Sequence, residues 1–165
     1  MHRFTRRAAI AGGLSLLGAC GQKFVPYRGP EVTKIEVHKE HRRMFLIHNT
    51  SVLEHYRVQL GFTAEGHKQF YGDGKTPEGR YHINRRNPES SFFLSVGIDY
   101  PNARDRAFAA AKGKNPGGDI FIHGWGPEKR DPHHDWTAGC VAVTNHEMQQ
   151  VYAMVQNGVP VDIYA

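Results

Sequence analysis

The sequence contains few cysteines, no apolar stretch long enough to cross a bilayer, and no basic block interleaved with aromatic side chains. Its longest apolar run, residues 8–19, is well short of the roughly 20 residues that a membrane-spanning helix needs. The missing basic block argues against nucleic-acid binding. The 165 residues suffice for one domain with a hydrophobic core and are too few for two.

The N-terminus is typical of an export signal. Three arginines precede the apolar run, which ends in the small residues of Leu17-Gly18-Ala19 and then Cys20. We expect residues 1–19 to be removed and Cys20 to carry a lipid as the first residue of the mature chain, because the arrangement resembles a bacterial lipobox. An ordinary secretory signal with an incidental Cys20 is the alternative. Residues 5–10 also resemble a twin-arginine export signal.

The rest of the chain divides simply. Residues 20–30 contain two glycines and two prolines and are expected to form a tether, and residues 31–165 form the domain. Gly21 follows the cysteine where an Asp would indicate inner-membrane retention, so we expect a periplasmic protein anchored to the outer membrane. The formal charge of +5 falls to +2 once the three arginines of residues 1–19 are removed.

Short runs rich in β-branched and aromatic residues predict a mainly β domain. The expected strands are residues 32–37, 44–47, 56–60, 79–83, 92–98, 119–122, 140–143 and 159–164. Two helices are expected, at residues 102–112 and 145–156. For the second, Thr144 and Glu147 form a capping box, and Gly158 is expected to stop the helix.

Two motifs are misleading. The triplet Gly74-Lys75-Thr76 lacks the glycine that a phosphate-binding loop carries five residues earlier, and Pro77 blocks the helix that would follow. The cluster Asp131, His133, His134 and Asp135 could bind zinc, but adjacent histidines rarely face one metal. We therefore interpret the cluster as a solvated loop.

His123 and Cys140 are the main candidates for catalytic residues. If Cys20 is lipidated, Cys140 has no disulfide partner and is either an inert core thiol or a nucleophile. His123 ends an apolar strand, and a polar loop of 16 residues separates it from Cys140. A histidine can take the thiol proton, and backbone N–H groups at Gly139 and Cys140 can bind an oxyanion. The alternative is a core His123 bonded to a backbone carbonyl.

These residues resemble the L,D-transpeptidase catalytic domain family (YkuD-like). His123-Gly124 and Thr137-Ala138-Gly139-Cys140 match its His-Gly and Ser/Thr-x-Gly-Cys signature. The run Gly72-Asp73-Gly74-Lys75-Thr76-Pro77-Glu78-Gly79-Arg80-Tyr81 matches a second motif. The resemblance covers residues 31–165.

The resemblance implies a β-rich, sandwich-like or barrel-like fold in which Cys and His share a cleft under a flap. Cys140 would attack a peptidoglycan stem peptide at the L-centre of a diamino acid and expel the terminal D-amino acid. His123 would act as base, the carbonyl of Gly124 would orient its ring, and Thr137, Ala138 and Gly139 would contact the oxyanion or substrate. The acceptor would be an amine or water, with no metal or organic cofactor.

The sequence departs from the family pattern twice. Ala138 stands where many members have His, and Ala142 stands where many have an Arg that helps to hold substrate. Substrate carboxylate recognition is thus unassigned, and we consider the loop residues as substitutes: Lys129, Arg130, His133 and His134. Two other functions stay open, a peptidoglycan L,D-carboxypeptidase or amide hydrolase, and a catalytically silent wall-binding lipoprotein. The intact His123–Cys140 pair argues against the silent protein.

Overall fold

The computed structural model describes residues 22–165, so the expected signal segment 1–19 and Cys20 lie outside the described residues. Within this part of the chain there are eight strands and two helices. Their bounds are β1 Lys34–His38, β2 Arg43–His48, β3 Ser51–Arg57, β4 Gly79–Asn87, β5 Ser95–Ile98, α1 Ala103–Ala111, β6 Phe121–His123, β7 Val141–Ala142, α2 Asn145–Met154 and β8 Pro160–Tyr164.

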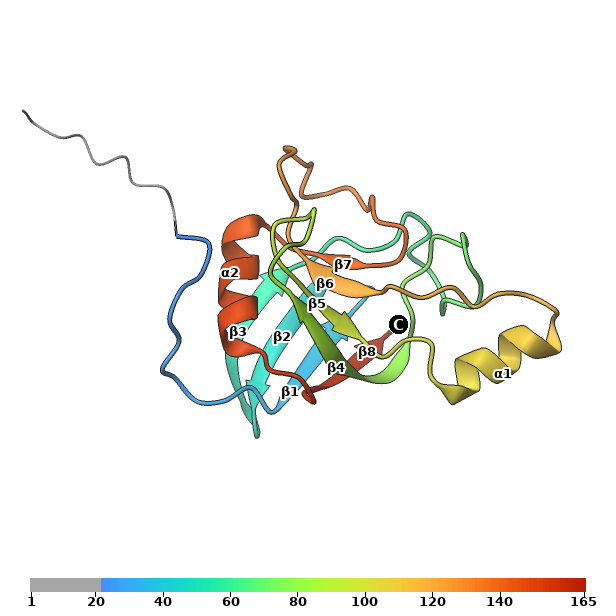
Figure 1. Ribbon diagram of the computed structural model, residues 1–165, viewed down its shortest axis with the longest axis horizontal. Helices are drawn as coiled ribbons and strands as arrows, with labels where there is room; N and C mark the ends of the chain where they lie inside the picture. Colours follow the sequence, from blue (N-terminus) through green and yellow to red (C-terminus); the bar gives the residue numbers. More distant parts are fainter. Residues whose placement is uncertain (1–21) are drawn as a thin grey trace, which may run out of the picture.

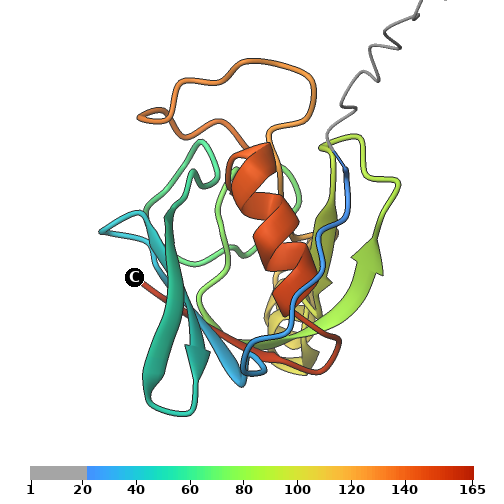
Figure 2. The ribbon, with the colours of Figure 1, turned by 90° about the vertical axis from the view of Figure 1, so that its left-hand side faces the viewer.

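The strands form one sheet in the order β3-β2-β1-β8-β4-β5-β6-β7. The sheet curls, so that β1–β3 and β4–β6 face each other across the body of the domain (Figures 1 and 2). The parallel pairs are β1 with β8 and β6 with β7, and the other neighbours are antiparallel. The mainly β fold with two helices is therefore confirmed.

Helix α2 fills the hollow of the curled sheet (Figure 2). Its apolar stripe, Met148, Val151 and Met154, is buried in the main hydrophobic core. The predicted capping box between Thr144 and Glu147 is present. The helix ends at Met154, earlier than expected. Its C-cap is extended, and the predicted glycine stop lies four residues beyond the helix end.

Helix α1 lies outside the sheet at the far end of the molecule (Figure 1). Asn102 caps it by accepting hydrogen bonds from the backbone N–H groups of Arg104 and Asp105, and the Asp105 carboxylate accepts one in return from Asn102. The helix buries only Asp105 and Ala109. Polar contacts at its N-terminus, more than apolar packing, therefore fix its position.

Three strands differ most from the expectation, and one of them, β4, runs to Asn87 instead of ending at residue 83. Residues 56–60 were expected to be a strand, but β3 ends at Arg57, because Gln59 leaves β2 and exchanges backbone hydrogen bonds with Ala142 instead. Strand β5 begins at Ser95, later than the predicted residue 92. Residues 92–94 turn instead, with Phe93 at a positive φ of 75°, and Phe92 lines the pocket described below.

Residues 22–30 lack strands and helices and lie along α2 (Figure 2). The carbonyl of Gln22 accepts a hydrogen bond of 2.6 Å from the Gln149 side chain. The ring of Phe24 lies 6.0 Å from that of Tyr152. No helix between residues 22 and 165 is long and apolar enough to cross a membrane.

Candidate active site

The parallel pairing of β6 with β7 brings His123 and Cys140 together. Ile122 pairs with Val141 and His123 with Ala142, so Cys140 enters the sheet beside the strand that ends in His123. Both side chains line one pocket of about 290 Å³. Its other walls come from the β4–β5 connection and the start of β6: Asn87, Glu89, Ser90, Ser91, Phe92, Ser95, Asp119 and Phe121. The pair predicted from the sequence thus shares a cavity.

The ring of His123 is buried and held in one tautomer. Its Nδ1 lies 2.6 Å from the carbonyl oxygen of Gly124, which can only accept, so Nδ1 carries the proton. Nε2 is left as the acceptor. The rings of Phe92 and Trp136 lie 4.6 and 5.7 Å from the imidazole and fix its plane. The carbonyl group of Gly124 therefore lies where the resemblance implied that it would orient the His123 ring.

Burial keeps the imidazole neutral. It lowers the pKa of His123 below its ordinary value, the bond to Gly124 opposes this, and the Arg130 charge lowers the pKa further. A neutral imidazole can accept a proton, so the ring is available as a general base at neutral pH.

Cys140 is half-buried, and its thiol is held in the protonated form. Sγ donates to the carbonyl oxygen of Asp119 at 3.5 Å, and among the described residues no hydrogen bond joins it to His123. Burial raises the pKa of the Cys140 thiol, although a backbone hydrogen bond from Phe121 works in the opposite direction. Both shifts favour a neutral thiol beside a neutral imidazole in the resting site.

The backbone before Cys140 requires glycine. Gly139 has a φ of 127°, and a Cβ there would lie 2.5 Å from the carbonyl oxygen of Lys75. Thr76 is fully buried beside it, and its hydroxyl accepts the backbone N–H of Gly61 at 3.0 Å. The Thr-Pro motif therefore forms the rigid support behind the nucleophile loop.

Two of the loop residues predicted to contact the oxyanion or substrate, Thr137 and Gly139, form hydrogen bonds within the loop. The N–H of Gly139 donates to the Thr137 hydroxyl at 3.2 Å, and this hydroxyl donates to the carbonyl of Cys140 at 2.7 Å. Thr137 thus shapes the loop from a buried position, and the Gly139 N–H is occupied. Ala138 is exposed. The backbone N–H of Cys140 has no hydrogen-bond partner in the part of the chain that the structure describes.

The loop between His123 and Cys140 is held by side chains that the sequence motifs did not indicate. The amide of Asn145 accepts from the N–H of Gly126 at 3.0 Å and donates to its carbonyl at 2.7 Å. Trp125 donates to the Gln59 side chain at 2.8 Å. Asn145 follows the capping threonine of α2, but nothing in its local pattern indicates contact with a loop 19 residues away.

Asp135 also holds this loop. Its carboxylate accepts the N–H of Leu60 at 2.9 Å and two hydrogen bonds from Arg42. Its place in the Asp-His cluster is therefore structural. Between residues 22 and 165, no group of three or more His, Cys, Asp or Glu side chains is arranged to hold a metal ion.

The four loop residues considered for carboxylate recognition do not line the pocket. Arg130 stacks on Trp136, 4.0 Å from its ring centre, and pairs with Glu128 at 2.6 Å. Lys129, His133 and His134 are exposed.

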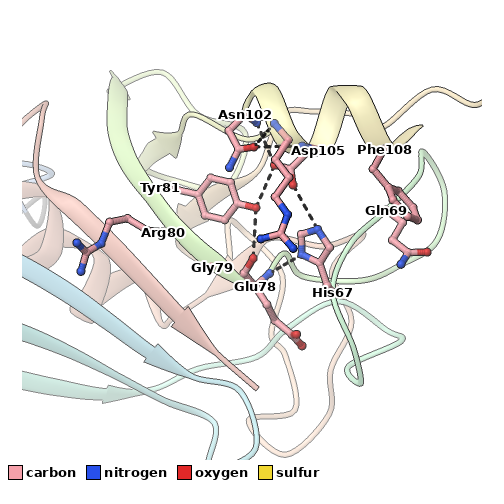
Figure 3. Close-up of a pocket in the computed structure, with 10 residues that line it drawn as sticks. His67, Gln69, Glu78, Gly79, Arg80, Tyr81, Asn102, Asp105 and Phe108 are labelled. Atoms are coloured by element: carbon pink, nitrogen blue, oxygen red, sulfur yellow. Dashed lines mark hydrogen bonds and ion pairs between the residues drawn. The ribbon is translucent and has the colours of Figure 1, made fainter. Parts of the chain in front are cut away.

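A larger pocket of about 430 Å³ lies beside α1 (Figure 3). His67 points into it, and both of its ring nitrogens have polar neighbours. Nδ1 accepts from the N–H of Glu78 at 2.9 Å, and Nε2 lies 3.3 Å from Asp105. The Tyr81 hydroxyl donates to the same carboxylate at 3.1 Å (Figure 3). These groups satisfy one another, and no cysteine lines this pocket.

The chain is similar to known proteins over most of its length. It is 29% identical over 144 residues to YafK of Escherichia coli (strain K12), whose name assigns it provisionally to L,D-transpeptidases. The match covers 79% of this chain and 52% of YafK, so the chain spans about half the length of this relative.

Solved structures share the fold. The helical cell shape determining protein Pgp2 of Campylobacter jejuni superimposes with a TM-score of 0.62 at 24% identity, over 86% of this chain and 50% of that one. The Enterococcus faecium L,D-transpeptidase gives 0.54 at 17% identity, over 82% and 50%. The model of the YkuD family, the L,D-transpeptidase catalytic domain, matches residues 33–163. The chain therefore belongs to the YkuD L,D-transpeptidase catalytic domain family.

Proposed function

We propose that the chain is a cysteine-dependent peptidoglycan L,D-transpeptidase acting on stem peptides, with Cys140 as nucleophile and His123 as general base. One observation carries the proposal: both side chains line the same pocket, and the bond from His123 to Gly124 leaves Nε2 as a proton acceptor. Family membership supports the peptidoglycan substrate.

The first half-reaction makes a thioester. Rotation of the Cys140 side chain moves its proton from the Asp119 carbonyl toward Nε2 of His123. Sγ attacks the carbonyl carbon at the L-centre of the diamino acid while Nε2 takes the thiol proton. The backbone N–H of Cys140 is placed to bind the oxyanion. Collapse breaks the C–N bond, and His123 returns its proton to the departing D-amino acid.

The second half-reaction releases the enzyme. An acceptor amine, or water, attacks the thioester carbonyl while Nε2 of His123 takes a proton from it. The C–S bond breaks, and the sulfur of Cys140 regains the proton from His123. An amine gives a cross-link or an anchored group, and water gives a shortened stem. The two outcomes share every protein group and differ only in the acceptor.

Mass spectrometry of muropeptides tests the proposal. The full-length protein and its Cys140→Ala variant are incubated with purified muropeptides. New dimers joined between two diamino acids, formed only by the wild type, would support the transpeptidase. Shortened stems or released wall-bound groups would assign hydrolysis by the same chemistry. No change in either sample would contradict an enzyme and favour the wall-binding protein.

A carbapenem gives an independent readout, because an active-site thiol should open its strained ring and keep it as an acyl adduct. We expect one added mass on the wild type and none on Cys140→Ala. An unmodified wild type, beside a family member that is labelled under the same conditions, would argue against Cys140 as nucleophile.

We also propose that the chain is exported and anchored to the periplasmic face of the outer membrane through lipid on Cys20. The motif before Cys20 supports this proposal. Radioactive palmitate should label the wild type, and Cys20→Ser should be unlabelled and released from membranes. Equal labelling of both proteins would contradict the anchor.

A further inference from the structure

An arginine–aspartate pair lies at the edge of the pocket that contains Cys140. Arg85 Nη2 donates to Asp119 Oδ1 at 2.8 Å, and the Arg85 guanidinium lies over the ring of Phe121, 4.4 Å from its centre. Asp119 and Phe121 line the pocket directly. The pair therefore presents a cation and an anion side by side next to the nucleophile.

The sheet register fixes the arginine in this place. Arg85 on β4 pairs with Gly97 on β5, and Gly97 pairs with Phe121 on β6, so the three residues form a row across neighbouring strands (Figure 1). A Cβ on Gly97 would lie 2.7 Å from Cγ of Arg85. The missing side chain at Gly97 therefore lets Arg85 cross β5 and reach Phe121. Stacking on Phe121 then orients the guanidinium.

The aspartate is tied to the nucleophile through its own backbone. Its carbonyl oxygen accepts the hydrogen bond from the Cys140 thiol, and its φ of 55° turns the chain immediately before β6. The charges of Asp119 and Arg85 both act on the Cys140 thiol. Around them the pocket wall combines the rings of Phe92 and Phe121 with uncharged polar side chains and the exposed carboxylate of Glu89; the polar residues are Asn87, Ser90, Ser91 and Ser95.

We propose that Arg85 and Asp119 are specificity residues that bind a substrate side chain ending in both a carboxylate and an ammonium group. The guanidinium binds the carboxylate and the Asp119 carboxylate binds the ammonium. Such a head group is the second amino-acid centre of a diamino dicarboxylic acid. The inference rests on the proposed function, and it assigns the carboxylate recognition that Ala142 cannot supply.

The exposure of the pair makes this exchange feasible. The Arg85 side chain is 42% exposed and that of Asp119 is 87% exposed. Water solvates both partners, so the ion pair contributes little to stability and its atoms can turn to a ligand at small cost. A guanidinium has five donors, and the bond to Asp119 uses one of them.

The test compares three stem tetrapeptides that differ only in the third residue: a diamino dicarboxylic acid, its side-chain carboxamide, and lysine. The value of kcat/KM for release of the terminal D-amino acid is measured for the full-length wild type, Arg85→Gln and Asp119→Asn. Affinities for the same peptides are measured in the Cys140→Ala background, where no turnover occurs. Arg80→Gln is the matched control, because it removes an exposed arginine that pairs with Asp162 away from this pocket.

We expect the wild type to prefer the dicarboxylic stem over its carboxamide by about tenfold or more, the usual strength of a charge-assisted hydrogen bond. Arg85→Gln should remove this preference and Arg80→Gln should keep it. Asp119→Asn should weaken binding of all three stems, because each carries the side-chain ammonium. Gly97→Ala should act like Arg85→Gln, because the new methyl group displaces the arginine.

Equal losses on the acid and carboxamide stems in Arg85→Gln would overturn the inference and leave a structural role for the pair. If the wild type turns over no stem, the proposed function fails. The affinities in the Cys140→Ala background then decide the inference alone.

Discussion

Two of the histidines that line pockets contrast in how their ring nitrogens are used, His67 beside α1 and His123 beside Cys140. His67 uses Nδ1 to accept from Glu78 and Nε2 to reach Asp105 (Figure 3). His123 uses Nδ1 to donate to Gly124, which leaves Nε2 as an acceptor, and the residue lines the pocket that contains Cys140. The larger pocket therefore has the better-bonded imidazole and the smaller pocket has the reactive one. A free ring nitrogen beside a nucleophile identifies the site better than cavity size.

The largest expected effect is on activity at His123. His123→Gln should lower kcat/KM by about 10³-fold, because general-base catalysis contributes roughly 10²–10⁴. His67→Gln should leave kcat/KM within about twofold but destabilise the fold by about 1–3 kcal/mol, because Glu78 and Asp105 lose their partner. Steady-state kinetics and urea unfolding of both variants measure the contrast. Comparable activity losses in both would mean that the two pockets act together.

A second test concerns the support behind the nucleophile. Gly139→Ala should lower activity by about 10²-fold and destabilise the fold by more than about 1 kcal/mol, since it combines a strained φ with a Cβ against the Lys75 carbonyl. Gly79 has a similar φ of 117°, and a Cβ added there would meet nothing within 4 Å. Gly79→Ala is therefore the control for backbone strain alone. Equal activity losses would show that the close contact is unimportant.

Variants of two asparagines, one beside each pocket, extend the comparison of the two pockets. Asn145→Ala should lower kcat/KM by about tenfold, because the loop after His123 loses two hydrogen bonds to Gly126 and its position becomes less defined. Asn102→Ala, beside His67, should cost about 1 kcal/mol of stability as a lost helix cap and leave turnover unchanged. Turnover and thermal melting of each variant separate the two effects, and unchanged kinetics in Asn145→Ala would exclude a positioning role.

The smallest expected effect is on pH dependence. The pKa of His123 is lowered from 6.5, so the imidazole should become protonated only below that pH. The acid limb of the kcat/KM profile should therefore also lie below pH 6.5. Arg130→Gln removes a cation that disfavours the imidazolium, so the pKa should rise and the limb should move to higher pH by less than about one unit. An acid limb that moves to lower pH in Arg130→Gln would contradict the expected effect of the Arg130 charge on the pKa of His123.

The thiol gives a matching measurement. Because burial raises the pKa of Cys140 above 9.0, the rate of alkylation by iodoacetamide should still increase with pH above 9. A rate that is already constant at neutral pH would instead indicate a stable thiolate. Cys140→Ala identifies any labelling elsewhere.

Local signals in the sequence were sufficient to identify two residues that share a pocket and to predict the helix starts. The His-Gly and Gly-Cys motifs predicted the pocket pair, and the capping box predicted the start of α2. The motifs did not predict Arg85 beside Asp119, because that contact depends on the register of three strands. The edge strand β3 was predicted too late in the chain, because its side chains are mostly exposed and show no alternation of apolar and polar residues.

The hydrogen bond from the Cys140 thiol to the Asp119 carbonyl has a consequence for oxidation. Peroxides and disulfides react with the thiolate, and a thiol held neutral by burial and by an acceptor carbonyl reacts with them slowly. In the proposed mechanism the sulfur becomes strongly nucleophilic only when it turns to Nε2 of His123. The hydrogen bond to the Asp119 carbonyl therefore also protects the resting sulfur from oxidation.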